Sequence, residues 1–380
     1  MFQLSFWEKQ SYFSGIDVLI AGSGIVGLNA AIALKQKNPR LHILIVDRGF
    51  LPYGASTRNA GFACFGSISE LLDDLTHMSE QDVFGLLLKR WNGLKRLRSL
   101  LKDANMGYEG YGGYEVFSHN DNELFNKCIK ALSFFNSHLK ELTGYREVYK
   151  LSDDKIGAFG FNNVQHLICN EHEGQIDAGK MMKALAAKAR EQGIDIVNGI
   201  EIEKFETENN HVKIFTKQNF SFDTMRLLIT TNGFARQLIP NLEVIPARAQ
   251  VLITAPIDNL KIKGTFHYDK GYYYFRNVGN RLLLGGGRNL DFEKERTDEF
   301  GLTEQVQKRL DEMMQQIILP GVRYSIEHRW SGIMGLGSSK TVIMQQVMPH
   351  VYCAVRMGGM GIAIGSLVGA DAADMLLQNF

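Results

Sequence analysis

The sequence predicts a protein of the α/β class, with a second, α+β domain built on an antiparallel sheet. Three observations predict this fold. Residues 16–48 follow the pattern strand, tight turn, helix, strand, and residues 174–232 return to alternating helix and strand patterns. Residues 245–288 alternate apolar and polar positions in runs separated by turn signals, as antiparallel strands do. We expect a discontinuous first domain at 1–100, 165–240 and 325–380, and a second domain at 101–164 and 241–324.

Helices are predicted where apolar residues recur at three- and four-residue spacing. In chain order, these patterns cover about 69–104, 122–142, 178–192, 302–316 and 361–378. A glycine cluster at 107–113 predicts a turn, and the apolar run 351–355 predicts a late strand.

The composition favours small molecules as partners. Lys and Arg number 42 against 41 Asp and Glu, so no net field favours nucleic acid or an acidic membrane. The four cysteines form no CxxC pair, so we expect neither a metal site nor a disulfide framework. Because the N-terminal residues lack a signal-peptide pattern and no run of eighteen apolar residues occurs, we expect a cytoplasmic protein without a membrane span.

A glycine-rich turn follows the first predicted strand with the spacing GxGxxG. The first glycine permits the tight turn, the second lets the backbone approach a pyrophosphate, and the third lets the helix pack closely against the sheet. The free N–H groups at the helix N-terminus then face the phosphates. These features predict a Rossmann-like dinucleotide site that comprises Gly22, Ser23, Gly24, Ile25, Val26 and Gly27.

An acidic residue completes the dinucleotide pattern. Asp47 stands at the end of the next predicted strand, twenty residues after Gly27, where a carboxylate can accept hydrogen bonds from a ribose diol. Its neighbour Arg48 is a further candidate contact. The fingerprint alone does not separate NAD from FAD.

Four segments beyond the fingerprint resemble the D-amino acid oxidase, glycine oxidase and sarcosine oxidase family of FAD enzymes. They are GASTRNAGFA at 54–63, GQIDAGKMMKALAAKARE from 174, EIEKF at 201–205 and MGGMGIAIG at 357–365. The resemblance spans nearly the whole chain and implies FAD. An NAD-linked enzyme would leave the C-terminal glycine loop without a role. The segment 332–346 lacks the cysteine that links the flavin covalently in sarcosine oxidases, so we expect non-covalent FAD.

The resemblance assigns cofactor contacts residue by residue. It implies that Ser56 and Thr57 meet the pyrophosphate, that residues 59–61 lie along the isoalloxazine, and that Ile202 meets adenine. Backbone N–H groups near the C-terminal helix would stabilise the negative charge that develops when the flavin takes up a hydride. The remaining expected contacts are Asn59, Ala60, Gly61, Thr231, Asn232, Gly233, Gly332, Arg356, Gly358, Gly359, Met360, Gly361 and Ile362.

The substrate side is expected on the antiparallel sheet. Tyr272, Tyr274 and Arg276 share one face of a predicted strand, where the family places a tyrosine against the substrate carboxylate. Arg248 is a further cationic candidate, as is Arg288. Against the assignment of the tyrosines, aromatic strand residues are usually packing. Two histidines, His267 and His328, are titratable near neutral pH but more often serve as structural groups.

One position departs from the family pattern. Amino-acid oxidases of this family often carry arginine after the segment Trp-x-Gly, whereas this chain has Met334 two residues after Gly332. Either another arginine binds a substrate carboxylate or the substrate is a less acidic amine.

These observations predict an oxidoreductase that oxidises the C–N bond of an amino acid or other amine by hydride transfer to flavin N5. Oxygen or a quinone would accept the electrons. Two alternatives remain open at this point. One is a 2-hydroxy acid dehydrogenase on the same fold, and the other is a flavin-binding subunit without its own catalysis.

Overall fold

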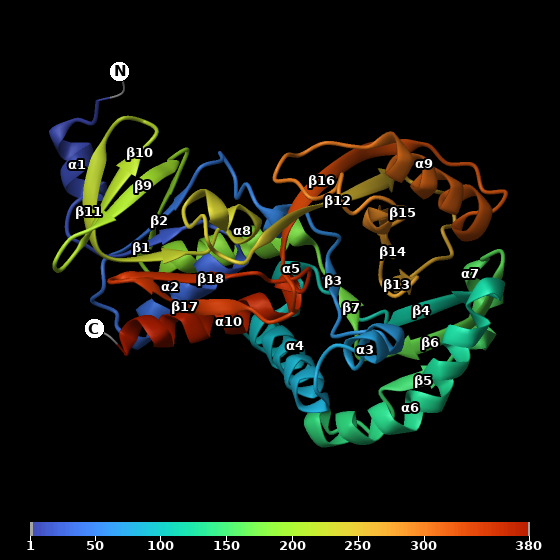
Figure 1. Ribbon diagram of the computed structural model, residues 1–380. Coiled ribbons are helices and arrows are strands. Elements are labelled where there is room, and N and C mark those ends of the chain that lie inside the picture. Colours follow the sequence, from blue (N-terminus) through green and yellow to red (C-terminus); the bar gives the residue numbers. More distant parts are fainter. Residues whose placement is uncertain (1–2, 379–380) are drawn as a thin grey trace.

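A computed structural model describes residues 3–378 of the chain (Figure 1). Within this range, the strands form two eight-stranded sheets and one two-stranded sheet. The first sheet has the order β17-β18-β11-β1-β2-β8, and β10 and β9 continue from β11 on a branch. Its strands are β1 (Ile16–Ala21), β2 (Ile43–Asp47), β8 (Asp195–Asn198), β9 (Ile202–Thr207), β10 (Val212–Thr216), β11 (Ser221–Ile229), β17 (Ile343–Met348) and β18 (Val351–Val355).

The centre of this sheet is parallel, as the βαβ pattern predicts. Parallel pairing joins β18 to β11, β11 to β1, β1 to β2 and β2 to β8. Strands β1, β2 and β18 are almost fully buried, because helices cover the sheet (Figure 1). The fold class that the sequence predicts, an α/β domain with a second α+β part, is confirmed.

Small residues let the covering helices approach one another closely. Helix α2 (Ile25–Lys37) packs against α10 (Gly361–Leu377), and α10 also packs against α4 (Glu80–Leu101). A Cβ atom on Gly369 would lie 2.7 Å from Asn29 Cβ, and one on Gly93 would lie 2.0 Å from the carbonyl oxygen of Ala363. The apolar C-terminal stretch is thus a buried helix. None of the helices between residues 3 and 378 combines the length and apolarity needed to cross a bilayer.

The second sheet has the order β16-β12-β15-β14-β13-β4-β6-β5 and lies on the right in Figure 1. All of its neighbouring pairs are antiparallel except β13 and β4. Its strands are β4 (Gly113–Ser118), β5 (Tyr149–Leu151), β6 (Val164–Asn170), β12 (Ile245–Thr254), β13 (Thr265–Tyr268), β14 (Tyr273–Val278), β15 (Arg281–Gly286) and β16 (Ile326–Leu336).

The residues at which the chain passes from one sheet to the other do not coincide with the expected domain boundaries at 165 and 325. Strand β6 begins at Val164 and β16 begins at Ile326, yet both belong to the second sheet. Strand β16 pairs with β12 from Ile245 to Thr254. The chain therefore crosses between the sheets inside segments that the sequence pattern assigned to the first domain.

Helices α6 (Asn122–Thr143) and α9 (Glu304–Met313) accompany the second sheet, and a π-helical turn, Met314–Ile318, extends α9. The helix expected at 69–104 is divided into α3 (Ile68–Asp74), α4 and α5 (Asp103–Met106). Ser79 begins α4, because its hydroxyl accepts the N–H of Asp82 at 3.2 Å. The remaining helices are α1 (Phe6–Tyr12), α7 (Ile156–Phe159) and α8 (Ala178–Glu191).

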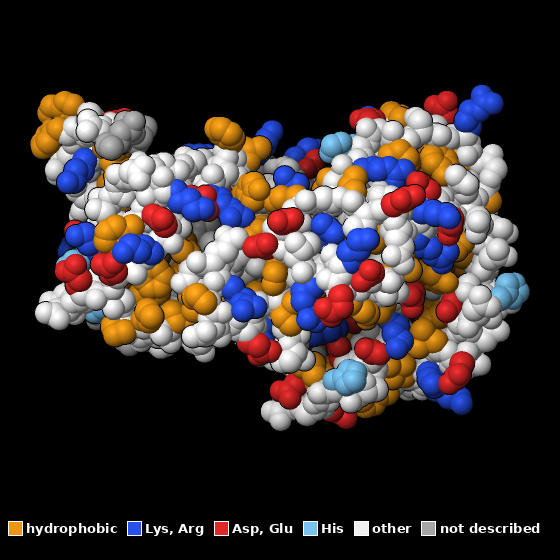
Figure 2. Space-filling model, turned by 45° about the horizontal axis from the view of Figure 1, so that its top comes forward, with side chains coloured by type: hydrophobic (Ala, Val, Ile, Leu, Met, Phe, Trp, Pro, Cys, Tyr) orange, Lys and Arg blue, Asp and Glu red, His pale blue; other side chains and the backbone are white. Residues whose placement is uncertain are grey.

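A short two-stranded sheet connects the two parts of the protein. Strands β3 (Phe62–Ala63) and β7 (Gly174–Gln175) pair in antiparallel register between the large sheets. On the face shown in Figure 2, Lys and Arg side chains are interspersed with Asp and Glu, in keeping with the balanced composition. The site that follows lies where the carboxyl ends of β1, β2 and β11 face the second sheet.

Candidate active site

A cavity of about 770 Å³ extends from the first sheet to the second. At one end it is lined by the turn after β1 and by Asp47 at the end of β2. At the other end it is lined by Tyr272 and Tyr274 of the second sheet. Ligands of open α/β sheets bind at this position, outside the carboxyl ends of the parallel strands.

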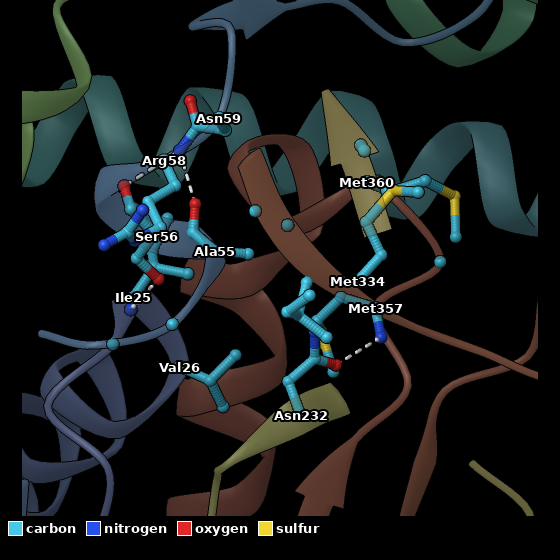
Figure 3. A pocket seen from close by; sticks show the side chains of 18 of the residues that line it. Ile25, Val26, Ala55, Ser56, Arg58, Asn59, Asn232, Met334, Met357 and Met360 are labelled. Carbon is cyan, nitrogen blue, oxygen red and sulfur yellow. Dashed lines mark hydrogen bonds between the residues drawn. The ribbon is translucent and has the colours of Figure 1, made fainter. Parts of the chain in front are cut away.

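The glycines of the GxGxxG turn are required by the backbone geometry. Gly22 has φ +106°, a conformation that L side chains rarely adopt. A Cβ on Gly27 would lie 2.1 Å from the carbonyl oxygen of Gly22, so only glycine lets α2 begin here. The hydroxyl of Ser56 accepts the N–H of Ile25 at 3.0 Å, while Val26, in the first turn of the helix, lines the cavity (Figure 3).

Asp47 is held at the cavity wall by four hydrogen bonds. It accepts the N–H and the hydroxyl of Ser23 at 2.9 Å each, and the N–H groups of Gly49 and Tyr53 at 3.0 and 3.3 Å. Asp47 is 8% exposed and lines the cavity, and each of its carboxylate oxygens accepts two of these hydrogen bonds. The guanidinium of the neighbouring Arg48 lies over the ring of Tyr53, 4.4 Å from its centroid.

The loop 54–61 is fixed by its own side chains. Asn59 donates from Nδ2 to the carbonyl oxygens of Ala55 and Ser56, at 3.1 and 2.8 Å, and accepts the N–H of Gly61 at 2.9 Å (Figure 3). Gly61 has φ +77°, and its carbonyl oxygen accepts the N–H of Ile176 at 2.8 Å. The loop therefore presents its backbone along the cavity in one conformation.

A second backbone wall comes from the start of α10. Asn232 accepts the N–H groups of Arg356 and Met357 with its Oδ1, both at 3.0 Å, and so positions the glycine turn that leads into the helix (Figure 3). The first residues of α10, Gly361 and Ile362, line the cavity. Their N–H groups are among those that a helix leaves unpaired at its N-terminus, where they favour negative charge.

A family model described as FAD dependent oxidoreductase matches residues 17–375. The chain belongs to this family of FAD-dependent oxidoreductases. FAD is therefore its cofactor, and the expectation drawn from the four resembling segments is confirmed.

Relatives of this flavoenzyme are distant in sequence and close in fold. The probable oxidoreductase OrdL of Haemophilus influenzae is 20% identical over 96% of this chain and 83% of its own length. Iminodiacetate oxidase from Chelativorans sp. BNC1 superposes with a TM-score of 0.77 at 16% identity, covering 95% of each chain. Glycine oxidase from Bacillus cereus superposes with a TM-score of 0.73 at 17% identity, covering 96% of each chain.

The walls of the cavity fit FAD. The N-terminus of α2 and the hydroxyl of Ser56 suit the pyrophosphate, and Asp47 suits the ribose diol. A Cβ added to Gly24 would lie 3.0 Å from Ser56 Oγ, so a side chain at this position would crowd the space beside the turn that the glycine leaves open. The buried hydroxyl of Thr231 has no hydrogen-bond partner among residues 3–378, so it is free for a ligand. The start of α10 suits the flavin pyrimidine edge.

Most of the expected cofactor residues line the cavity. The exceptions among the described residues support the walls from behind: Thr57 donates to the carbonyl oxygen of Pro52, and Arg356 donates to Glu243 at 2.9 Å. The lining includes Gly22, Gly24, Ile25, Val26, Asp47, Arg48, Ser56, Asn59, Ala60, Gly61, Ile202, Thr231, Asn232, Gly332, Gly358, Gly359, Met360, Gly361 and Ile362, and does not include Ser23, Gly27, Thr57, Gly233 or Arg356.

On the substrate side, Tyr272, Tyr274 and Arg288 line the cavity. The ring of Tyr274 lies over Gly285 of the neighbouring strand, where a Cβ would come within 2.5 Å of the ring. Burial raises the pKa of Tyr274 to about 12, so its phenol remains a hydrogen-bond donor at neutral pH. The side chain of Arg288 is half-buried, and it has no carboxylate or hydrogen-bond partner within residues 3–378.

The structure places two expected cationic residues outside the cavity. Arg248 pairs with the buried Glu295, with Nε 2.8 Å from the carboxylate. Arg276 donates to the backbone carbonyl oxygens of Ala60 and Ile176, the latter at 3.0 Å. Burial lowers the pKa of Arg276 to about 10. Arg276 therefore supports the loop 54–61, called the flavin loop below, and neither guanidinium is free for a substrate.

A group of charged residues on the cavity wall was missed by the sequence analysis. Glu70 accepts hydrogen bonds from Arg90 and Lys340 at 3.0 and 2.8 Å, and Lys340 also contacts Asp74 at 2.7 Å. Burial by itself would raise the pKa of Glu70. The positive charges of Arg90 and Lys340 outweigh this effect and hold the pKa well below its usual range. Arg90 is 3% exposed and lies on the apolar face of α4. A lone arginine in that apolar stripe is the signal that points to this group.

Proposed function

We propose that this flavoenzyme oxidises the C–N bond of an amino acid, and that Arg288, Tyr272 and Tyr274 bind the substrate carboxylate. The observation that carries the proposal is the guanidinium of Arg288 on the cavity wall, which lies over the ring of Phe292 at 4.8 Å and has no carboxylate partner within residues 3–378. A half-buried arginine without a carboxylate partner is costly unless a ligand supplies one. This assignment also accounts for Met334, since the carboxylate is bound from another strand.

The residues of the chain orient the substrate and exclude water. Arg288 offers a forked pair of donors to a carboxylate, and the phenol of Tyr274 offers a third donor. When bound, FAD would accept the hydride of the substrate Cα–H at N5, leaving an imine that water hydrolyses. The aromatic side chains Phe62 and Tyr274 contact each other at a centroid distance of 5.6 Å and present an apolar surface to the substrate.

The similar structures support a substrate of this class. One is a glycine oxidase and another is an iminodiacetate oxidase, and the substrate in each name is a small compound that carries both an amine and a carboxylate. A 2-hydroxy acid also carries a carboxylate, so the carboxylate site alone does not separate it from an amino acid.

Anaerobic reduction of the bound flavin tests the proposal. The protein is mixed with amino acids, the corresponding amines without a carboxylate, and 2-hydroxy acids, while flavin absorbance near 450 nm is followed. We expect bleaching by an amino acid and none by its decarboxylated amine. Bleaching by 2-hydroxy acids alone would favour the dehydrogenase alternative, and bleaching by none would favour a flavin-binding subunit.

The variant Arg288→Gln tests the role of the guanidinium. We expect KM for the amino acid to rise about 10- to 100-fold, because a hydrogen bond to a charged group contributes about 1.5–3 kcal/mol. Arg281→Gln is the matched control, since Arg281 lies on the same β-hairpin but donates to Thr254 and Glu327. An unchanged KM in Arg288→Gln would contradict the assignment.

A further inference from the structure

Three metal-ligating side chains meet at the junction of the two parts of the protein. Cys64 follows β3, Glu173 precedes β7, and His267 lies in β13. Their ligand atoms, a sulfur, a carboxylate oxygen and a ring nitrogen, all lie within 4.8 Å of one another. Neither the FAD site nor the proposed carboxylate site uses these groups.

The hydrogen bonds of the three groups leave ligand capacity for an ion. The Nε2 atom of His267 is buried and has no hydrogen-bond partner within the described chain. Cys64 Sγ lies 3.3 Å from Thr265 Oγ1 and 3.8 Å from the carbonyl oxygen of Gly174. One carboxylate oxygen of Glu173 accepts the N–H groups of Phe65 and Gly66, at 2.7 and 3.1 Å. A buried nitrogen without a partner is unfavourable unless something binds it.

We propose that Cys64, Glu173 and His267 bind one Zn²⁺ ion. A thiolate, an imidazole and a carboxylate form a donor set that zinc accepts, with about 2.3 Å to sulfur and about 2.0 Å to nitrogen. The thiolate and the carboxylate together carry two negative charges, which balance the ion where burial would otherwise disfavour both. Binding draws the three groups together from their present spacing through side-chain rotation.

The ion has a structural consequence and leaves a coordination position open. It links the segment that follows β3, through Cys64, to the second sheet, through His267. Both residues line the cavity, so a fourth position of a tetrahedral ion faces it and takes water or a substrate group. The carboxylate ligand is fixed by Phe65 and Gly66, as carboxylate ligands of metals commonly are.

Zinc content and zinc-edge X-ray absorption test the proposal on the FAD-loaded protein. The protein is equilibrated with zinc, passed over a chelating resin and analysed for metal and flavin. We expect one zinc ion per chain in the wild type, and loss of the ion in Cys64→Ser and in His267→Gln. The matched control is His211→Gln, because His211 lies on the surface between Glu208 and Asp223. We expect this variant to retain its zinc.

The X-ray absorption spectrum of the wild type tests the proposed ligands even if a variant fails to fold. We expect one sulfur among the first-shell scatterers in the wild type. A wild type that retains no zinc, a first shell without sulfur, or loss of the ion in His211→Gln alone would overturn the proposal. Retention of zinc in folded Cys64→Ser and His267→Gln, with flavin content at the wild-type level, would overturn it as well.

Discussion

The carboxylate of Asp47 accepts two hydrogen bonds from Ser23, one from its backbone N–H and one from its hydroxyl, each 2.9 Å long. The pairing joins the end of β2 to the turn that precedes α2. It fixes the orientation of Asp47 before any ligand arrives, so the expected contact with a ribose would cost little side-chain entropy.

Replacement of Asp47 by alanine is expected to weaken FAD binding about 10- to 100-fold, because a charged acceptor contributes about 1.5–3 kcal/mol to a hydrogen bond. Titration of apoprotein with FAD, followed by quenching of flavin fluorescence, measures the effect. Asp17→Ala is the control, since Asp17 accepts the N–H of His42 at 2.7 Å and does not line the cavity. Equal dissociation constants for the two variants would contradict the ribose assignment.

Gly61→Ala is expected to lower both stability and flavin content. The residue has φ +77°, and the added Cβ would lie 2.4 Å from the carbonyl oxygen of Ile176 and 2.6 Å from Arg276 Nη2. The strained backbone alone costs about 1–3 kcal/mol. Gly54→Ala in the same loop is the control, because its Cβ meets nothing within 4 Å. Urea unfolding and the ratio of flavin to protein absorbance would show no difference between the variants if this interpretation were wrong.

The βαβ unit could be predicted from sequence because its determinants are local. The strand pattern, the glycine spacing and Asp47 all lie within residues 16–47, and each glycine answers a backbone requirement of its own turn. The resemblance to a known family extended this to the cofactor. The presence of the helices could also be predicted from local apolar spacing. The breaks at Leu75–Ser79 and Lys102 could not, because they depend on capping and turn geometry.

The substrate side depends on tertiary contacts that no local pattern contains. Strand alternation correctly separates Tyr274 from the buried Tyr273. It does not reveal that Arg276, on the same face, turns to the carbonyl oxygens of Ala60 and Ile176. The group around Glu70 and the one formed by Cys64, Glu173 and His267 join residues as much as 270 positions apart. Such sites arise only once the sheets meet.

Carboxylate binding is expected to be independent of pH between about pH 7 and pH 10. An ordinary tyrosine has a pKa of about 10, whereas burial raises the pKa of Tyr274 to about 12. Below that pKa the phenol is neutral and donates a hydrogen bond; above it, the phenolate repels a carboxylate. The dissociation constant of a carboxylic acid without an amino group, measured from the flavin spectrum, provides the test.

The pH dependence of this dissociation constant can also contradict the proposed role of Tyr274. Loss of affinity with a midpoint near pH 10 would mean that the phenol titrates as if exposed. Tyr274→Phe should bind the acid about 10- to 100-fold more weakly, since a hydrogen bond to a charged carboxylate contributes about 1.5–3 kcal/mol. This variant should keep a flat pH profile over the same range.

Replacement of Arg276 and replacement of Arg288 are expected to change different quantities, the FAD dissociation constant in the first case and KM in the second. Arg276→Gln removes donors from the carbonyl oxygens of Ala60 and Ile176 and leaves them buried, at a cost of about 1–3 kcal/mol each. The flavin loop then loosens, so the FAD dissociation constant should rise. Arg288→Gln should leave FAD binding unchanged and raise KM, because Arg288 makes no such bonds within residues 3–378. Apoprotein titration and steady-state kinetics on both variants separate the roles. An Arg276→Gln protein that binds FAD normally but loses affinity for a carboxylate substrate would reverse the two assignments.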